Sequence, residues 1–148
     1  MKIVVQRVKS SSVSIGGELV SEIGMGMMIL VGVRVGDTPE DVDYAVRKAA
    51  NLRIFDDENG VMNRSVIDVG GELLAVSQFT LNASTKKGNR PSYIYAAGHE
   101  LAVPLYEMFC EKLEAAIGKE VKRGVFGADM QVALINDGPV TIIIDSQE

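Results

Sequence analysis

The apolar and polar positions at the start of the chain alternate as they do in β-strands. Residues 2–8 (KIVVQRV) and 12–15 (SVSI) have the two-residue period of half-buried strands, and Gly16-Gly17 predicts a hairpin turn into residues 18–24. Residues 25–33 (MGMMILVGV) form an unbroken apolar run, which is typical of a strand covered on both faces. The other predicted strands cover residues 72–81, 120–126, 129–135 and 140–145.

Two segments have the apolar spacing of helices. The first is expected to begin with Thr38 as N-cap and Pro39 at the first helical position. Its apolar residues share one face: Val42, Ala45, Val46 and Ala49. The second helix runs from about residue 98 to residue 117, and Pro104 is expected to kink or loosen its first turns. Residues 55–60 (FDDENG) are predicted to form a loop.

The order of these elements indicates the fold class. Strands come first, two strand–helix alternations follow, and a block of strands ends the chain, so we expect an α/β fold. Mixed, largely antiparallel sheets should be stacked with two helices on one side, in layers β/β/α. The length of 148 residues fits a single domain over residues 1–148.

Net charge and cysteine content limit the possible classes of function and the possible cellular compartments. The net charge is −5, whereas a protein that coats nucleic acid carries a broad basic face; contact with the end of an RNA remains open. No window reaches the roughly 18 to 20 apolar residues of a membrane span, and the first residues do not have the pattern of a secretion signal. Cys110 is the only cysteine, so no internal disulfide can form. We expect a cytoplasmic protein without a membrane partner.

A turn-forming motif interrupts the last apolar stretch. Residues 136–139 read Asn-Asp-Gly-Pro, between Leu134-Ile135 and the β-branched run 140–144. Asn-Asp-Gly predicts a hairpin turn. Pro139 has no N–H to donate to a ladder and is therefore unusual where a strand should begin to pair. The plain interpretation is a turn with a stiff exit.

The common catalytic groups are scarce. His99, the only histidine, lies at the predicted start of the second helix and is interpreted as a capping or surface residue. Cys110 lies at the margin of the apolar face of that helix and is interpreted as a buried hydrophobe. One histidine and one cysteine do not make an ordinary zinc site, and no nucleotide-binding glycine motif is present. A hydrolase that uses Ser77 or Thr80 with His99 stays open as an alternative.

Two stretches carry other chemistry. Ser77-Gln78-Phe79-Thr80-Leu81 places polar side chains at the end of an apolar strand, which is compatible with either an edge strand or a functional segment. The cations Lys86, Lys87 and Arg90 form the one compact basic cluster of an acidic chain. They are interpreted either as a solvated loop or as contacts to the phosphates of a nucleic acid.

Together these motifs resemble the D-aminoacyl-tRNA deacylase family. The resemblance rests on SQFTL (77–81), KKGNRPS (86–92) and NDGPVT (136–141), and it extends to MKIVVQRV (1–8), FDDENGVMNRSV (55–66) and VFGADM (125–130). The segments occur in the same order from end to end. Two positions depart from the family: Val61 replaces a usual lysine, and Tyr93 replaces a usual phenylalanine.

The resemblance implies a homodimeric, cytoplasmic hydrolase, and we expect no cofactor or metal. Its substrate would be the aminoacylated 3′ end of tRNA, from which it would release a D-amino acid, and it would also accept glycyl-tRNA. The resemblance further implies a cis Gly138–Pro139 bond, reaching into the partner's pocket as a gate that rejects L-residues sterically. Arg7 would brace this motif.

The resemblance also implies how the ester is cleaved. Backbone N–H groups around Gln78 and Phe79 would stabilise the oxyanion, and the 2′-OH of the adenosine would help to position or activate water. Ser77 and Gln78 would orient the adenosine, while Thr80 would have a supporting role. An alternative from a different class is a non-catalytic protein that binds an RNA end or a small ligand on the same fold.

Overall fold

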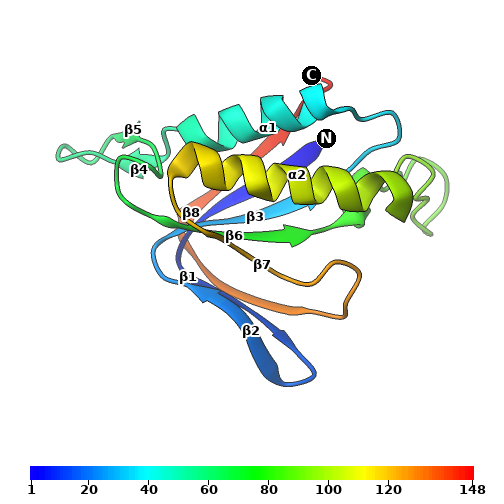
Figure 1. Ribbon diagram of the computed structural model, residues 1–148, viewed down its shortest axis with the longest axis horizontal. Helices are drawn as coiled ribbons and strands as arrows, with labels where there is room; N and C mark the ends of the chain where they lie inside the picture. Colours follow the sequence, from blue (N-terminus) through cyan, green and yellow to red (C-terminus); the bar gives the residue numbers. More distant parts are fainter.

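The computed structural model describes residues 1–148 and contains a six-stranded sheet, a two-stranded sheet and two α-helices (Figure 1). The strands of the large sheet are β1 (Lys2–Ile15), β2 (Glu18–Ile23), β3 (Gly26–Gly32), β6 (Glu72–Ser77), β7 (Val121–Arg123) and β8 (Gln131–Asp145). The small sheet consists of β4 (Phe55–Asp56) and β5 (Met62–Arg64). The helices are α1 (Pro39–Asn51), α2 (His99–Ile117) and the short 3₁₀ helix η1 (Phe79–Asn82).

The large sheet is organised around the long strand β1. Its first half pairs with β3 on one side and with the last residues of β8 on the other, and its second half pairs with β2 and with the first residues of β8. All three pairings are antiparallel, whereas β3–β6 and β6–β7 are parallel. The sheet is therefore mixed and largely antiparallel, as the sequence predicted.

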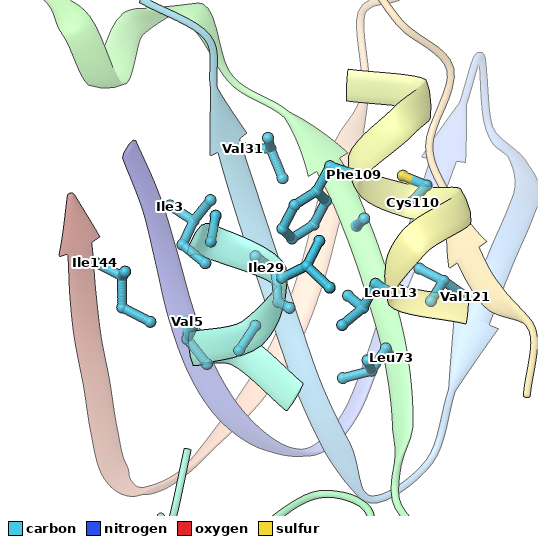
Figure 2. Packing of buried hydrophobic residues seen from close by; sticks show 14 of the residues in the cluster. Ile3, Val5, Ile29, Val31, Leu73, Phe109, Cys110, Leu113, Val121 and Ile144 are labelled. Carbon is cyan, nitrogen blue, oxygen red and sulfur yellow. The ribbon is translucent and has the colours of Figure 1, made fainter. Parts of the chain in front are cut away.

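The two helices lie side by side on one face of the sheet (Figure 1). The side chains of Phe109 and Leu113 on α2 point down onto strand residues such as Ile29 and Leu73, and all four are fully buried (Figure 2). Burying large apolar side chains of this kind is the main favourable term in folding, at roughly 1.5–3 kcal/mol for each. The expected helical layer on one side of the sheet is confirmed.

A second, smaller core forms on the opposite face. Val13 of β1 and Ile23 of β2 pack there with Met28, Leu74 and Val76 from the central strands. The second half of β1, together with β2, therefore folds back beneath β3 and β6. The Ser21 hydroxyl of β2 donates a hydrogen bond of 2.5 Å to the carbonyl of Arg123 on β7, although the two strands are at opposite ends of the strand order. The β/β/α layering of the predicted fold class is confirmed.

Both helices begin where the sequence indicates. In α1 the Asp41 carboxylate accepts a hydrogen bond of 2.8 Å from the N–H of Thr38, which acts as N-cap before Pro39. Helix α2 continues through Pro104 in its second turn and ends at Gly118, whose φ of 75° is in the left-handed region. None of the helices combines the length and the apolar composition that are needed to cross a membrane.

Several strand boundaries differ from the prediction. Residues 2–8 and 12–15 belong to one continuous strand, β1, because β8 pairs with both halves of it. The predicted strand 72–81 ends at Ser77, since the chain turns there into η1. The predicted loop 55–60 instead begins a small β4–β5 hairpin, and the predicted strand 120–126 shortens to β7.

The predicted hairpin at residues 136–139 is wrong. The segments before and after it are parts of one strand, β8, and both pair with β1: Asn136 is opposite Val8, and Thr141 is opposite Gln6. Residues 137–140 bulge out of the ladder opposite Arg7. Asn136 closes the bulge by accepting a hydrogen bond of 2.9 Å from the N–H of Val140. A bulge tolerates the missing N–H of a proline as well as a turn does, so local sequence could not separate the two.

Candidate functional site

The polar segment after β6 forms part of the wall of a mainly apolar pocket of about 640 Å³. Twelve of its eighteen lining residues are hydrophobic, as in most sites for organic ligands. The walls come from the carboxyl ends of β3 and β6, the start of α2, and a segment that leads into β8. Residues that line it include Val31, Ser77, Gln78, Phe79, Ala102 and Phe126.

The backbone at Gln78 sets the direction of this segment. Ser77 is paired with Val31 in the parallel ladder, and the Gln78 N–H donates a hydrogen bond of 2.7 Å to the Val31 carbonyl. The chain then turns into η1, where Phe79 is 54% exposed. The Gln78 N–H is thus already engaged, which removes it from the predicted oxyanion donors. As the first residues of η1, Phe79 and Thr80 have no acceptor for their N–H groups within that helix.

The polar side chains of the segment bond to one another. The side-chain amide of Gln78 donates a hydrogen bond to the Thr80 hydroxyl, while Ser77 is half-buried beside them. His99 is exposed on the rim of the pocket, with its ring edge-to-face with Phe126 at 5.4 Å between centroids. No hydrogen bond joins His99 to Ser77 or Thr80. The geometry therefore does not assemble a serine–histidine or threonine–histidine pair.

Cys110 is buried on α2, as interpreted from the sequence. Its side chain is fully inaccessible, and burial raises the pKa of the thiol to about 11. Burial also raises the pKa of the neighbouring Tyr106, whose hydroxyl donates to the carbonyl of Ala75 at 3.1 Å. A thiol that stays protonated at neutral pH is a poor nucleophile.

We expect Cys110→Ala to keep kcat within about tenfold of the wild-type value, because the thiol neither reaches the pocket nor ionises. Loss of its buried contacts should lower the free energy of unfolding by about 1 kcal/mol. Steady-state kinetics and urea denaturation measure the two quantities. A thiol reagent should label Cys110 of the wild-type protein only after the protein has been denatured. Rapid labelling of the folded protein at pH 7 would contradict this placement of Cys110.

The basic residues lie on a closed surface loop next to the pocket. Ser84 and Ser92 exchange two backbone hydrogen bonds of 2.8 Å, which hold residues 85–91 as a loop. Lys86, Lys87 and Arg90 are all exposed on it. Tyr93, directly after the loop, lines the pocket and contacts Phe79 edge-to-face at 5.1 Å. The cations are therefore placed beside the entrance.

The bulge of β8 is bound to Arg7, whose side chain is nearly buried. The Arg7 Nε donates a hydrogen bond of 2.9 Å to the Asp137 carbonyl, and its Nη1 donates one of 2.6 Å to the Ile54 carbonyl. Gly138 has a φ of 133°, and the Gly138–Pro139 peptide bond is cis. Both residues of the motif are exposed. Arg7 thus links β1, the bulge and the chain before β4.

The bulge and the pocket lie at opposite ends of the sheet. Arg7 is paired with Met27 at the beginning of β3, whereas the pocket is lined by Val31 and Val33 at its other end. Four residues of a strand span roughly 13 Å. In Figure 1 the β4–β5 hairpin, which Arg7 contacts at Asp56, is at the left end, and the segment that leads into α2 is at the right. Within one chain, Gly138 and Pro139 do not line the pocket formed by Ser77 and Gln78.

Sequence reasoning assigned no role to one wall of the pocket. That wall consists of residues 126–130 together with Ala96, Ala97 and Gly98 before α2. The first group belongs to the VFGADM segment of the resemblance. The second group is a run of three small residues before a helix start. This run was the sequence signal that could have indicated a binding site, because small side chains leave room for a ligand.

Comparison with known proteins agrees with the motifs. The sequence profile described as D-Tyr-tRNA(Tyr) deacylase matches residues 4–145. Proteins named D-aminoacyl-tRNA deacylase from Parabacteroides distasonis and Bacteroides thetaiotaomicron are 60% and 61% identical over 147 residues, covering 99% of this chain and 98% of each relative.

Solved structures add two relatives. One, described as c-Myc DNA Unwinding Element Binding Protein, has a TM-score of 0.92 and 45% identity, with 98% of each chain covered. The other, described as a probable eukaryotic D-amino acid tRNA deacylase, has a TM-score of 0.84 at 18% identity, covers 97% of this chain and 98% of the other, and shows the shared fold. The profile match and the high identity over nearly the whole chain establish that this protein belongs to the D-Tyr-tRNA(Tyr) deacylase family, a family of hydrolases.

Proposed function

We propose that the protein hydrolyses the ester bond between a D-amino acid and the 3′-terminal adenosine of tRNA in the cytoplasm, and that it also clears glycyl-tRNA. The observation that carries the proposal is the position of Ser77, Gln78 and Phe79 in the wall of an apolar pocket, with the first N–H groups of η1 beside them. An apolar pocket of about 640 Å³ has room for a nucleoside and a small acyl group.

Catalysis in this proposal uses the backbone in place of a side-chain base. The ester carbonyl is attacked by water, and the N–H groups of Phe79 and Thr80 stabilise the negative charge that develops on its oxygen. The adenosine 2′-OH positions or activates the water. Ser77 and Gln78 orient the adenosine, and the hydrogen bond from Gln78 gives Thr80 a supporting role.

Chirality in this proposal is selected by a second copy of the chain. Gly138 and Pro139 lie too far from the pocket of their own chain to contact its ligand, yet they are exposed and held by Arg7. In a homodimer they would enter the pocket of the partner and reject the side chain of an L-residue. The long strand β8 supports such an association, because its outer edge is unpaired and Ile135 and Ile143 are 58% and 64% exposed.

The tRNA would be held partly by the basic loop. We expect the replacement of Lys86, Lys87 and Arg90 by alanine to weaken tRNA binding and to reduce its salt dependence, because each lost phosphate contact lowers the slope by up to about 0.9. Hydrolysis of a short aminoacyl-adenosine should be nearly unchanged. A triple variant of Arg47, Lys48 and Lys112 removes the same charge from the two helices and is the matched control. Equal losses with both substrates would contradict the prediction.

A deacylation assay with purified protein tests the function. D-tyrosyl-tRNA should be hydrolysed, glycyl-tRNA should also be hydrolysed, and L-tyrosyl-tRNA should be spared. A substrate whose terminal adenosine lacks the 2′-OH should react slowly. Persistent hydrolysis of that analogue would favour the alternative in which Ser77 or Thr80 acts with His99.

A second candidate is non-catalytic binding of a nucleic-acid end. It is favoured by one observation, namely that a structural relative at 45% identity is described as a DNA-binding protein. Tight binding of tRNA or single-stranded DNA without turnover of any aminoacyl ester would support this candidate over the deacylase.

A further inference from the structure

Five large apolar side chains are exposed together beside the entrance of the pocket. They form what we call the aromatic patch: Val35, Phe79, Tyr93, Ile94 and Tyr95, with exposed fractions from 43% for Tyr93 to 71% for Ile94. Single exposed hydrophobic residues are ordinary, but a contiguous group marks a surface that contacts another molecule.

The backbone holds this patch against the pocket. The Val35 N–H donates a hydrogen bond of 2.9 Å to the Tyr95 carbonyl, and the Ala97 N–H donates one of 3.0 Å to the Val33 carbonyl. Val33, Ala97 and Tyr93 also line the pocket. A ligand that leaves the pocket on this side would therefore meet the aromatic patch next.

Cationic side chains flank the patch. The guanidinium of Arg34 lies over the ring of Tyr95 at 5.5 Å from its centroid, and Arg34 takes part in none of the ion pairs. On the other side, the Ser84–Ser92 pairing places the basic loop next to Tyr93. Aromatic rings alternating with cations are typical of surfaces that bind single-stranded nucleic acid. Lysine is instead depleted in the core of protein–protein interfaces, whereas the basic loop beside the patch carries Lys86 and Lys87.

We propose that the aromatic patch binds the unpaired nucleotides that precede the terminal adenosine of the RNA substrate. A base stacks on the outer face of the Arg34 guanidinium, which Tyr95 supports from the other side, and the phosphates next to it are neutralised by Arg34 and the basic loop. This inference rests on the proposed function and extends it from the reacting end to the next part of the substrate.

The test compares two substrates of different length. Tyr95→Ala and Arg34→Ala should each lower kcat/KM about tenfold for D-tyrosyl esters of a trinucleotide RNA with the 3′-terminal sequence of tRNA, a size expected for one lost base stack. The change should be in KM, with kcat retained. Hydrolysis of D-tyrosyl-adenosine, which lacks the preceding nucleotides, should be unchanged. Tyr95→Trp, which keeps an aromatic face, should retain activity on both substrates.

Arg47→Ala is the matched control, because the Arg47 guanidinium also lies 5.5 Å from the centroid of a tyrosine ring, that of Tyr44 on α1. It should leave both substrates unaffected. Equal losses on the long and the short substrate in Tyr95→Ala would overturn the proposal. So would dissociation of a dimer into monomers by Tyr95→Ala in sedimentation experiments, since the patch would then be a subunit contact.

Direct binding separates this inference from the deacylase proposal. If the wild-type protein hydrolyses neither ester, the proposed function is wrong, and the patch is then tested by fluorescence anisotropy with the uncharged trinucleotide. About tenfold weaker binding by Tyr95→Ala than by Arg47→Ala supports the patch as an RNA surface. Identical binding by the two variants overturns it.

Discussion

Phe79→Pro is expected to lower kcat for D-aminoacyl-tRNA by about 10²- to 10³-fold, the usual effect of removing one oxyanion donor. Proline deletes the N–H of Phe79, which has no acceptor within η1. The backbone should tolerate the change, because proline is favoured at the first position of a helix. Gln78, the preceding residue, has φ −147° and ψ 85°, outside the helical region that a following proline disfavours.

The control for this variant is Phe79→Ala. It removes the same exposed ring and its contact with Tyr93 but keeps the N–H. In single-turnover kinetics, the rate of hydrolysis should therefore fall much more in Phe79→Pro than in Phe79→Ala. If the two variants lose the same amount, the ring is the important group and the N–H is not an oxyanion donor. Circular dichroism and thermal unfolding check that both variants are folded.

Gly138→Ala is expected to lower the discrimination between D- and L-aminoacyl-tRNA about 100-fold. A Cβ on Gly138 would lie 2.8 Å from Cγ2 of Val140 and 3.1 Å from Nη2 of Arg7, and the φ of 133° is unfavourable for any L-residue with a side chain. The bulge must therefore shift, and a displacement of about 1 Å in a positioning group commonly costs about 10²-fold. The ratio of kcat/KM for D- and L-tyrosyl-tRNA measures the effect.

Gly118→Ala provides the matched control for Gly138→Ala. Gly118 also has a positive φ, of 75°, but a Cβ there would meet no atom within 4 Å, and the residue is at the end of α2, outside the pocket. The substitution should cost about 1–2 kcal/mol of stability from the left-handed backbone alone. Its D/L ratio should match the wild type. An unchanged ratio in Gly138→Ala would show that the bulge has no part in selection.

Mixing the two variants tests whether the gate comes from the partner. A heterodimer of Gly138→Ala and Phe79→Pro subunits has one pocket with an intact Phe79, facing an intact Gly138 from the other subunit. If the gate acts across the interface, these mixtures should regain selective hydrolysis. If the gate acted within one chain, every pocket would carry a defect, and no selective activity would return.

Much of the fold follows from local patterns. The alternation in β1, the apolar run of β3 and the capping residues Thr38 and Pro39 are local signals, and the structure has the corresponding elements. The burial of Cys110 also follows from its place on the apolar side of α2. The end of β6 at Ser77 was missed, because Gln78 and Phe79 are as compatible with a strand as with the turn into η1.

The candidate site was predicted as separate segments. The motifs around Ser77, Lys86 and Gly138 were found by resemblance, but the sequence could not predict how they are arranged in space. The structure places the first two beside one pocket and the third at the other end of the sheet. The engagement of the Gln78 N–H also emerged only from the structure, because this N–H bonds to Val31, which is 47 positions earlier in the chain.

The sequence by itself determined the secondary-structure types, the helical layer and the family, because these depend on side-chain periodicity, capping and motifs that are local in the chain. Tertiary structure alone decided that residues 131–145 form one bulged strand and that Arg7 binds the bulge. It also decided that the Gln78 N–H bonds to Val31 and that Tyr95 lies beneath Arg34. The physical reason is the same in each case: strand pairing and the partners of backbone groups depend on residues far apart in sequence, and the same local sequence satisfies more than one arrangement.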